Sequence, residues 1–148
     1  MAETKSFVKI LHVREREEMN AQKAYQQSID IFEQIATSFY HLLRKKEKAE
    51  MSYDELIQHA TTLDKVKEQA AYIEKLNKQI VQLQSEVQQA RNEMESNQSK
   101  LTDAHVEVKK FQNIIESRNN SEIEKEKKLE RNLMDEVSLQ QYISYKNR

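Results

Sequence analysis

An unbroken heptad repeat of apolar residues is the feature that most constrains this chain. Every seventh residue from 66 to 115 is apolar, and a second, mostly apolar series lies three positions later in each heptad. Seven residues nearly match two helical turns, so both series fall on one stripe along a helix. Such a stripe must be covered by another helix, and the sequence therefore predicts a coiled coil. The predicted seam residues of this helix are Val66, Ile73, Ile80, Val87, Met94, Leu101, Val108, Phe111 and Ile115.

The composition supports an all-α fold. None of the 148 residues is glycine or proline, the residues that most often make turns with positive φ or break helices. Charged residues make up 33% of the chain and aromatic residues 7%, which is typical of long solvated helices rather than of a domain with a thick core. We therefore expect neither a hairpin-rich β fold nor a glycine-dependent phosphate loop.

A weaker apolar repeat precedes the first one and predicts a partner helix. Its predicted seam residues are Tyr25, Ile29, Phe32, Ala36, Phe39 and Leu43. Polar residues occupy seam positions nearer the N-terminus, so looser packing or completion by another subunit is expected there. A further apolar set beside this stripe fits either a wide seam or a docking face. It consists of Ile31, Ile35 and Leu42.

Capping signals predict the boundaries of the helices. Ser52 and Glu55 have the spacing of a capping box, and Thr61 and Thr62 before Asp64 are suitable for a second helix start. The expected organisation is a single coiled-coil domain, 1–148, with helix 1 over about 6–50, a connector over about 51–62, helix 2 over about 63–117, and a C-terminal helical extension or partly disordered tail over 118–148.

Two arrangements of these helices fit the pattern. One is a long antiparallel two-helix hairpin with the connector at its tip, since the two striped segments are similar in length and separated by one break. The other is a parallel homodimer, which β-branched residues at one seam position favour. Asn97 lies on the seam, where it could specify the register of the helices or be a tolerated polar residue.

No residue pattern indicates catalysis, a cofactor or a metal. The chain has no cysteine, and the histidines at 12, 41, 59 and 105 share no ligand spacing. A formal net charge of −1 gives no bias toward nucleic acid or anionic lipid. No apolar run approaches the roughly 20 residues of a membrane span, and the N-terminus lacks a secretory signal. We expect a cytosolic binding protein, peripheral to a membrane through a protein partner.

Two surface features are candidates for binding. Tyr53 and Tyr72 flank the connector and lie off the predicted seam, where each could anchor a partner or pack against the connector. The densest basic run is 44–48, Arg-Lys-Lys-Glu-Lys. Such a run is most often a solvated helix face. Its alternative partner is an acidic protein surface, because no aromatic platform for nucleic acid accompanies it.

Four stretches spread over nearly the full length carry a family resemblance. They are Phe7–Leu11, Ala24–Ser28, His105–Phe111 and Met134–Ser138. In these stretches the chain resembles the family of FliJ, the small coiled-coil component of the bacterial flagellar type III export apparatus. No stretch is specific alone, but their order along the chain and the chain length also match. The resemblance implies a non-catalytic antiparallel coiled coil similar to the central stalk of rotary ATPases.

The resemblance also implies three classes of partner. The end carrying both termini would bind the hexameric export ATPase, and the hairpin middle or tip would bind the membrane export gate. The protein would also escort export chaperones, and it would be needed for flagellum assembly and motility. A structural alternative is a parallel dimeric spacer or scaffold protein, which light scattering would distinguish because the hairpin should be monomeric.

In the family, gate binding uses apolar and aromatic residues of the second helix. The matching positions are Tyr72, Leu76, Gln79 and Leu83. Gln79 and Leu83 replace a small residue and a histidine of the family pattern, and Leu76 and Leu83 also fall on the predicted seam. With Tyr53 added from its place near the connector, these are the residues expected to bind the gate.

Overall fold

The fold is a pair of long helices packed against each other. The computed structural model describes residues 2–59 and 61–147. Helix α1 is Ala2–Gln58 and helix α2 is Leu63–Lys146, and the described residues contain no strand. The expected all-α helical hairpin is confirmed. No helix among the described residues has a stretch both long enough and apolar enough to cross a membrane.

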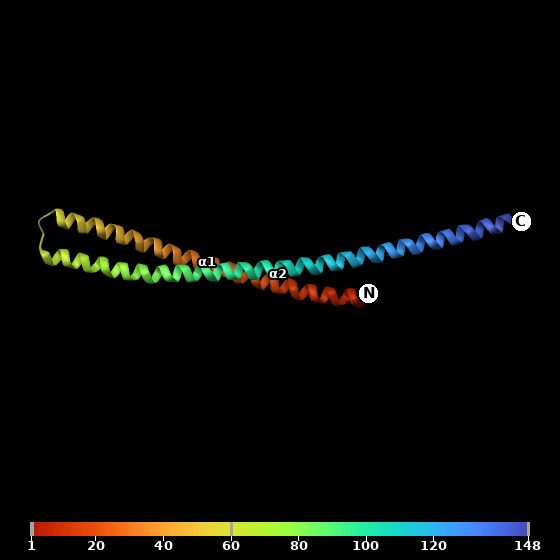
Figure 1. Ribbon diagram of the computed structural model, residues 1–148, viewed down its shortest axis with the longest axis horizontal. Coiled ribbons are helices and arrows are strands. Elements are labelled where there is room, and N and C mark those ends of the chain that lie inside the picture. Colours follow the sequence, from red (N-terminus) through yellow and green to blue (C-terminus); the bar gives the residue numbers. More distant parts are fainter. Residues whose placement is uncertain (1, 60, 148) are drawn as a thin grey trace. The chain divides into compact units, whose positions relative to one another are not determined.

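The chain divides into two compact units. The first unit combines Met1–Glu18 with Ala104–Arg148, and the second is Met19–Asp103. In the second unit, α1 and α2 lie side by side and are joined through residues 59–62 (Figure 1). In the first unit, the start of α1 packs against α2, and α2 continues past the N-terminal end of α1 (Figure 1).

Polar contacts within each unit show that the helices run antiparallel. In the second unit, the Gln69 side chain donates a hydrogen bond to the Ala49 carbonyl at 3.0 Å, and Asn97 donates to the Ala24 carbonyl at 3.5 Å. A later residue on α2 therefore meets an earlier residue on α1. In the first unit, Arg118 meets Glu3 at 2.7 Å, in the same direction.

The seam of α2 follows the predicted heptad. Each of its predicted seam residues is buried or half-buried. Leu76 and Val108 are only 3% and 4% exposed, and Ile80 and Ala90 are 9% and 6% exposed. This single stripe forms the α2 side of the core, because the residues on the remaining faces of the helix are mostly exposed.

The seam of α1 differs in phase from the prediction. Tyr25, Phe32 and Phe39 lie on it, but the positions between them are Ser28, Ile35 and Leu42, in a heptad that continues from Thr4 to Leu56. The predicted Ile29 and Ala36 are half-buried beside the seam, and Leu43 is 39% exposed. Of the residues predicted to lie beside the stripe, Ile35 and Leu42 are in the seam and Ile31 is 49% exposed.

Ser28 explains why the phase of α1 is hidden in the sequence. Its side chain is 6% exposed, and its hydroxyl donates a hydrogen bond to the Tyr25 carbonyl at 2.6 Å. A buried hydroxyl is tolerated when it is hydrogen-bonded. A polar residue at a seam position breaks the apolar pattern, so hydrophobicity alone favours the neighbouring Ile29.

The connector is shorter than predicted, because α1 continues to Gln58. Ala49 is 4% exposed and Tyr53 and Leu56 are half-buried, so burial against α2 extends the helix through the capping-box spacing at Ser52. The Thr61 hydroxyl donates to the Leu56 carbonyl at 3.3 Å at the helix end. Residue 60 of the predicted connector lies outside the described residues.

The start of α2 follows from local chemistry. It begins at Leu63, where the Thr62 backbone carbonyl accepts a hydrogen bond from the Val66 amide at 3.4 Å and Asp64 lies in the first turn. An acidic residue there interacts favourably with the helix dipole. Of the two states predicted for 118–148, the structure has the helical one through Lys146.

We expect Ile80→Asp to destabilise the hairpin strongly. It buries an unpaired carboxylate in the seam, at a cost of about 3 kcal/mol or more. The melting temperature followed by circular dichroism should fall by about 10 °C. Gln82→Asp is the matched control, because Gln82 is exposed, and it should change little. Equal melting of the two variants would contradict the assigned seam.

Candidate partner-binding surfaces

The side chains of the described residues form no metal site. No group of three or more histidines and carboxylates among them is arranged to hold an ion. His12, His41 and His59 are exposed, and the Nδ1 atom of His105 lies 3.2 Å from a carboxylate oxygen of Glu18. A surface hollow such as that between Asp30 and Ser38 lies along one helix. The candidate functional features of the described residues are exposed surfaces that other proteins can contact.

The structure separates the residues predicted to bind the gate into two groups. Leu76 is 3% exposed and Leu83 is half-buried, and both pack in the seam between the helices. A partner cannot reach Leu76 without opening the hairpin. Substitutions at Leu76 would therefore act through stability, and this side chain is not available for docking.

Tyr72 and Gln79 form the accessible group. Both are exposed, and Tyr72 is 45% exposed. They are seven residues apart, so they lie on the same side of α2, next to the seam. An exposed tyrosine can bury a large ring against a partner at low cost in side-chain entropy. We call the surface around these two residues the Tyr72 face.

Tyr53 does not belong to the Tyr72 face. It lies on the seam of α1 and is half-buried. The prediction that it lies off the seam is wrong, because α1 continues to Gln58 and its heptad puts Tyr53 at a seam position. Of the two roles considered for Tyr53, packing within the hairpin is the one that the structure favours.

In the first unit, aromatic and arginine side chains from both helices stack. The rings of Phe7 and Phe111 are 6.2 Å apart between centroids. The Arg118 guanidinium lies 4.6 Å from the centre of the Phe7 ring, and that of Arg14 lies 6.0 Å from the centre of the Phe111 ring. Cation–π contacts contribute about 0.5–1 kcal/mol each at exposed sites. This stack joins the start of α1 to α2.

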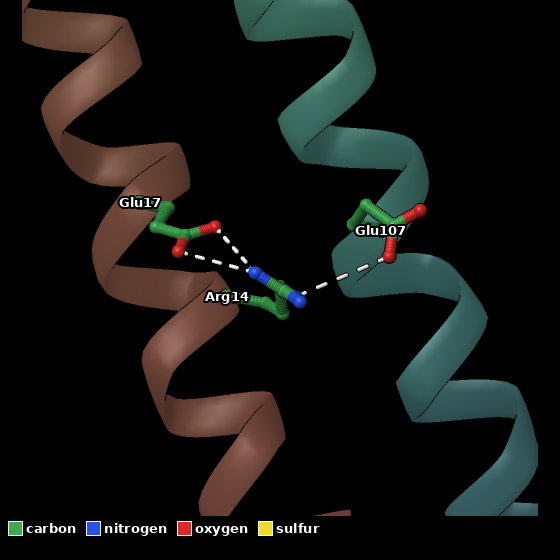
Figure 2. Close-up of polar contacts among 3 residues, drawn as sticks. All are labelled: Arg14, Glu17 and Glu107. Atoms are coloured by element: carbon green, nitrogen blue, oxygen red, sulfur yellow. Dashed lines mark hydrogen bonds and ion pairs between the residues drawn. The ribbon is translucent and has the colours of Figure 1, made fainter.

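Arg14 also links two carboxylates across the helices. Figure 2 shows its guanidinium between Glu17 on α1 and Glu107 on α2. Its Nη1 donates to both Glu17 carboxylate oxygens, at 3.1 and 2.9 Å, and its Nε lies 4.0 Å from Glu107. The Nε atom is buried without a hydrogen bond. The sequence did not indicate Arg14 as a seam residue. It lies on the seam only in the α1 heptad that the structure shows, which differs from the predicted one.

Glu3 and Arg118 close the same end of the helix pair. The Arg118 Nη1 atom donates a hydrogen bond to a Glu3 carboxylate oxygen at 2.7 Å. This hydrogen bond and the positive charge of Arg118 lower the pKa of the Glu3 carboxyl. A carboxyl whose pKa is lowered by folding adds stability above the pKa of an unfolded glutamate, and that stability is lost as the pH falls through the folded-state pKa.

We expect Arg118→Gln to raise the pKa of Glu3 toward its ordinary value. The substitution removes both the charge and most of the donor geometry that favour the carboxylate. An NMR titration of the Glu3 side-chain carbonyl would measure the change. Arg131→Gln is the control, because Arg131 contacts the Lys127 carbonyl and not Glu3. An unchanged Glu3 titration in Arg118→Gln would contradict the contact.

The C-terminal part of α2 is a second exposed surface. All residues from 123 to 147 are exposed. Leu129, Leu133 and Val137 follow one another at four-residue steps and form one stripe, and Glu126 and Glu130 lie on the same side of the helix. Helical stability in proteins comes mainly from packing of an amphipathic face. An uncovered stripe of this kind is a candidate for docking onto another protein, and we call it the C-terminal stripe.

Comparisons with known proteins find sequence relatives over nearly the whole chain. A family model described as "Flagellar FliJ protein" matches residues 4–147. The Flagellar FliJ protein of Bacillus subtilis (strain 168) is 29% identical over 137 residues, which cover 93% of this chain and 93% of that protein. No solved structure matches this chain.

Proposed function

Because the chain belongs to the FliJ family of flagellar proteins, we propose that it is a non-catalytic component of the flagellar type III export apparatus. It couples the export ATPase ring to the membrane export gate and escorts export chaperones, and flagellum assembly and motility depend on it. The observation that carries this proposal is the family match over residues 4–147. The Tyr72 face is the surface that binds the export gate.

Two separate exposed surfaces support a linking role. Tyr72 and Gln79 lie in the second unit, and the C-terminal stripe lies in the first. Because no described residue covers the C-terminal stripe, it is free to bind the ATPase ring. The Tyr72 face is equally accessible to the gate. A chain with two such surfaces can hold two partners at once without chemistry of its own.

The proposed location is the cytoplasmic face of the cell membrane at the flagellar base, where the protein is held by its partners. In isolation it is a monomer, because α1 supplies the helix that α2 needs. The alternative of a parallel dimeric spacer finds no support in the packing, since the contacts between α1 and α2 run antiparallel within one chain. Light scattering of the purified protein checks the monomer.

Tyr72→Ala should weaken binding to the export gate at least tenfold. Loss of a true interface anchor costs about 2 kcal/mol or more, and removal of a side chain that is 45% exposed leaves the seam intact. Binding of the purified variant to the gate protein, followed by swimming in cells, would measure the effect. Tyr40→Ala is the matched control, since Tyr40 is 55% exposed on the opposite side of the seam. Unchanged gate binding by Tyr72→Ala would remove the docking assignment.

Removal of residues 122–148 should weaken binding to the export ATPase and leave gate binding unchanged, because it deletes the C-terminal stripe and leaves the Tyr72 face. The double variant Leu133→Asp/Val137→Asp tests the same stripe in a full-length chain. Ser138→Asp/Tyr142→Asp is its control, since both residues are exposed and lie on the other side of the helix. If neither the deletion nor Tyr72→Ala altered flagellar assembly, the proposed export function would be wrong.

A further inference from the structure

The helical period points the side chains of the basic run 44–48 in different directions, so they have different neighbours. Lys46 forms an ion pair with Glu50 at 3.8 Å, and the Arg44 guanidinium lies 5.8 Å from the centre of the Tyr40 ring. Lys45 and Lys48 are exposed, and neither forms an ion pair within residues 2–59 and 61–147. The two lysines are therefore the part of the run that remains available to a partner.

Heptad positions place these lysines on the side of the hairpin that carries Tyr72. We letter each heptad a to g, with the seam at a and d, so that g and c lie on one side and e and b on the other. With Phe39 and Ile73 at a positions, Lys45 and Tyr72 occupy g, and Lys48 and Lys75 occupy c.

Contacts in the second unit show which sides of the two helices meet. Asn97 at a d position reaches the Ala24 carbonyl at a g position, and Arg91 at an e position lies 5.7 Å from the centre of the Phe32 ring at an a position. The g positions of α1 and α2 therefore share one side of the hairpin. Lys45 and Lys48 lie on the same side as Tyr72.

A hydrogen bond also fixes the level at which these residues meet. The Gln69 side chain bonds to the Ala49 carbonyl. Moving away from the connector, Tyr72 lies about one turn from Gln69, and Lys45 lies about one turn from Ala49. Lys48 is adjacent to Ala49 in sequence, so the lysines of α1 stand at the level of Tyr72.

The α2 helix adds a third lysine to this side. Lys75 is exposed, lies three residues beyond Tyr72, and has no ion pair among the described residues. Glu68 borders the surface toward the connector. The acidic residues at this level lie largely across the seam, at e and b positions. They are Glu47, Glu50 and Glu74.

From this arrangement we propose that the Tyr72 face binds an acidic segment of its partner. The segment carries carboxylates that pair with Lys45, Lys48 and Lys75 around a side chain that packs on the Tyr72 ring. The inference rests on the proposed docking of the export gate at this face, and it specifies the chemistry of the gate surface. Charges at the rim of an interface act mainly on the association rate and its salt dependence.

The test uses the triple variant Lys45→Glu/Lys48→Glu/Lys75→Glu of the full chain and the cytoplasmic portion of the gate protein. At low salt, the variant should associate at least tenfold more slowly than the unchanged protein. The association rate of the unchanged protein should fall as the salt concentration rises. The association rate of the variant should not depend on salt in this way. Circular dichroism should show the same melting temperature for both, because all three lysines are exposed.

A matched control separates the local effect from that of net charge. Lys23→Glu/Lys67→Glu/Lys109→Glu changes the charge by the same amount at exposed positions off the Tyr72 face, and it should associate within about twofold of the unchanged protein. Equal slowing by both triple variants would overturn the proposal.

Comparison with Tyr72→Ala separates two proposals: that the gate binds at the Tyr72 face, and that the bound segment is acidic. Suppose that Tyr72→Ala weakens gate binding while the lysine variant keeps the normal association rate and salt dependence. The proposal of an acidic segment is then wrong, and the docking of the gate at this face stands. If Tyr72→Ala leaves gate binding unchanged, the docking assignment itself fails.

Discussion

Burial of one heptad seam between two helices is the constraint on which the rest of this structure depends. The buried apolar side chains are Ala49, Leu76, Ile80, Ala90 and Val108, and all of them lie on this seam. Burying a side chain of the size of Leu or Ile contributes about 1.5–3 kcal/mol. With two helices, only one stripe of each can be covered, so every other apolar side chain faces solvent or a partner.

This constraint decides which residues are available for binding. Leu76 and Tyr72 are separated by one helical turn, yet the seam buries the first and leaves the second 45% exposed. The same reasoning applies to the C-terminal part of α2, where no described residue covers Leu129, Leu133 and Val137. In such a chain, the residues that the seam leaves exposed are the ones that can contact a partner, and the proposed adaptor role rests on them.

Polar residues within the seam set the register of the helices. Gln69 and Asn97 each donate to a backbone carbonyl of the opposite helix, that of Ala49 and that of Ala24. Buried polar groups are costly when unpaired, so these bonds disfavour a shift of one helix along the other. A polar seam residue is a well-established means of specifying register in coiled coils. Through Gln69, the register also brings Lys45 and Lys48 to the level of Tyr72.

The sequence by itself determined what depends on one helix at a time. A sustained repeat without glycine or proline predicts the all-α fold and the seam of α2, and Thr62 with Asp64 predicts its start. Tertiary structure decided the phase of α1, where the polar Ser28 takes a seam position, and the extension of α1 to Gln58. It alone placed Lys45 and Tyr72 on one side of the hairpin, at the same level. The physical reason is that the helical period orders neighbours within a helix, whereas the alignment of two helices is set by contacts between residues distant in sequence.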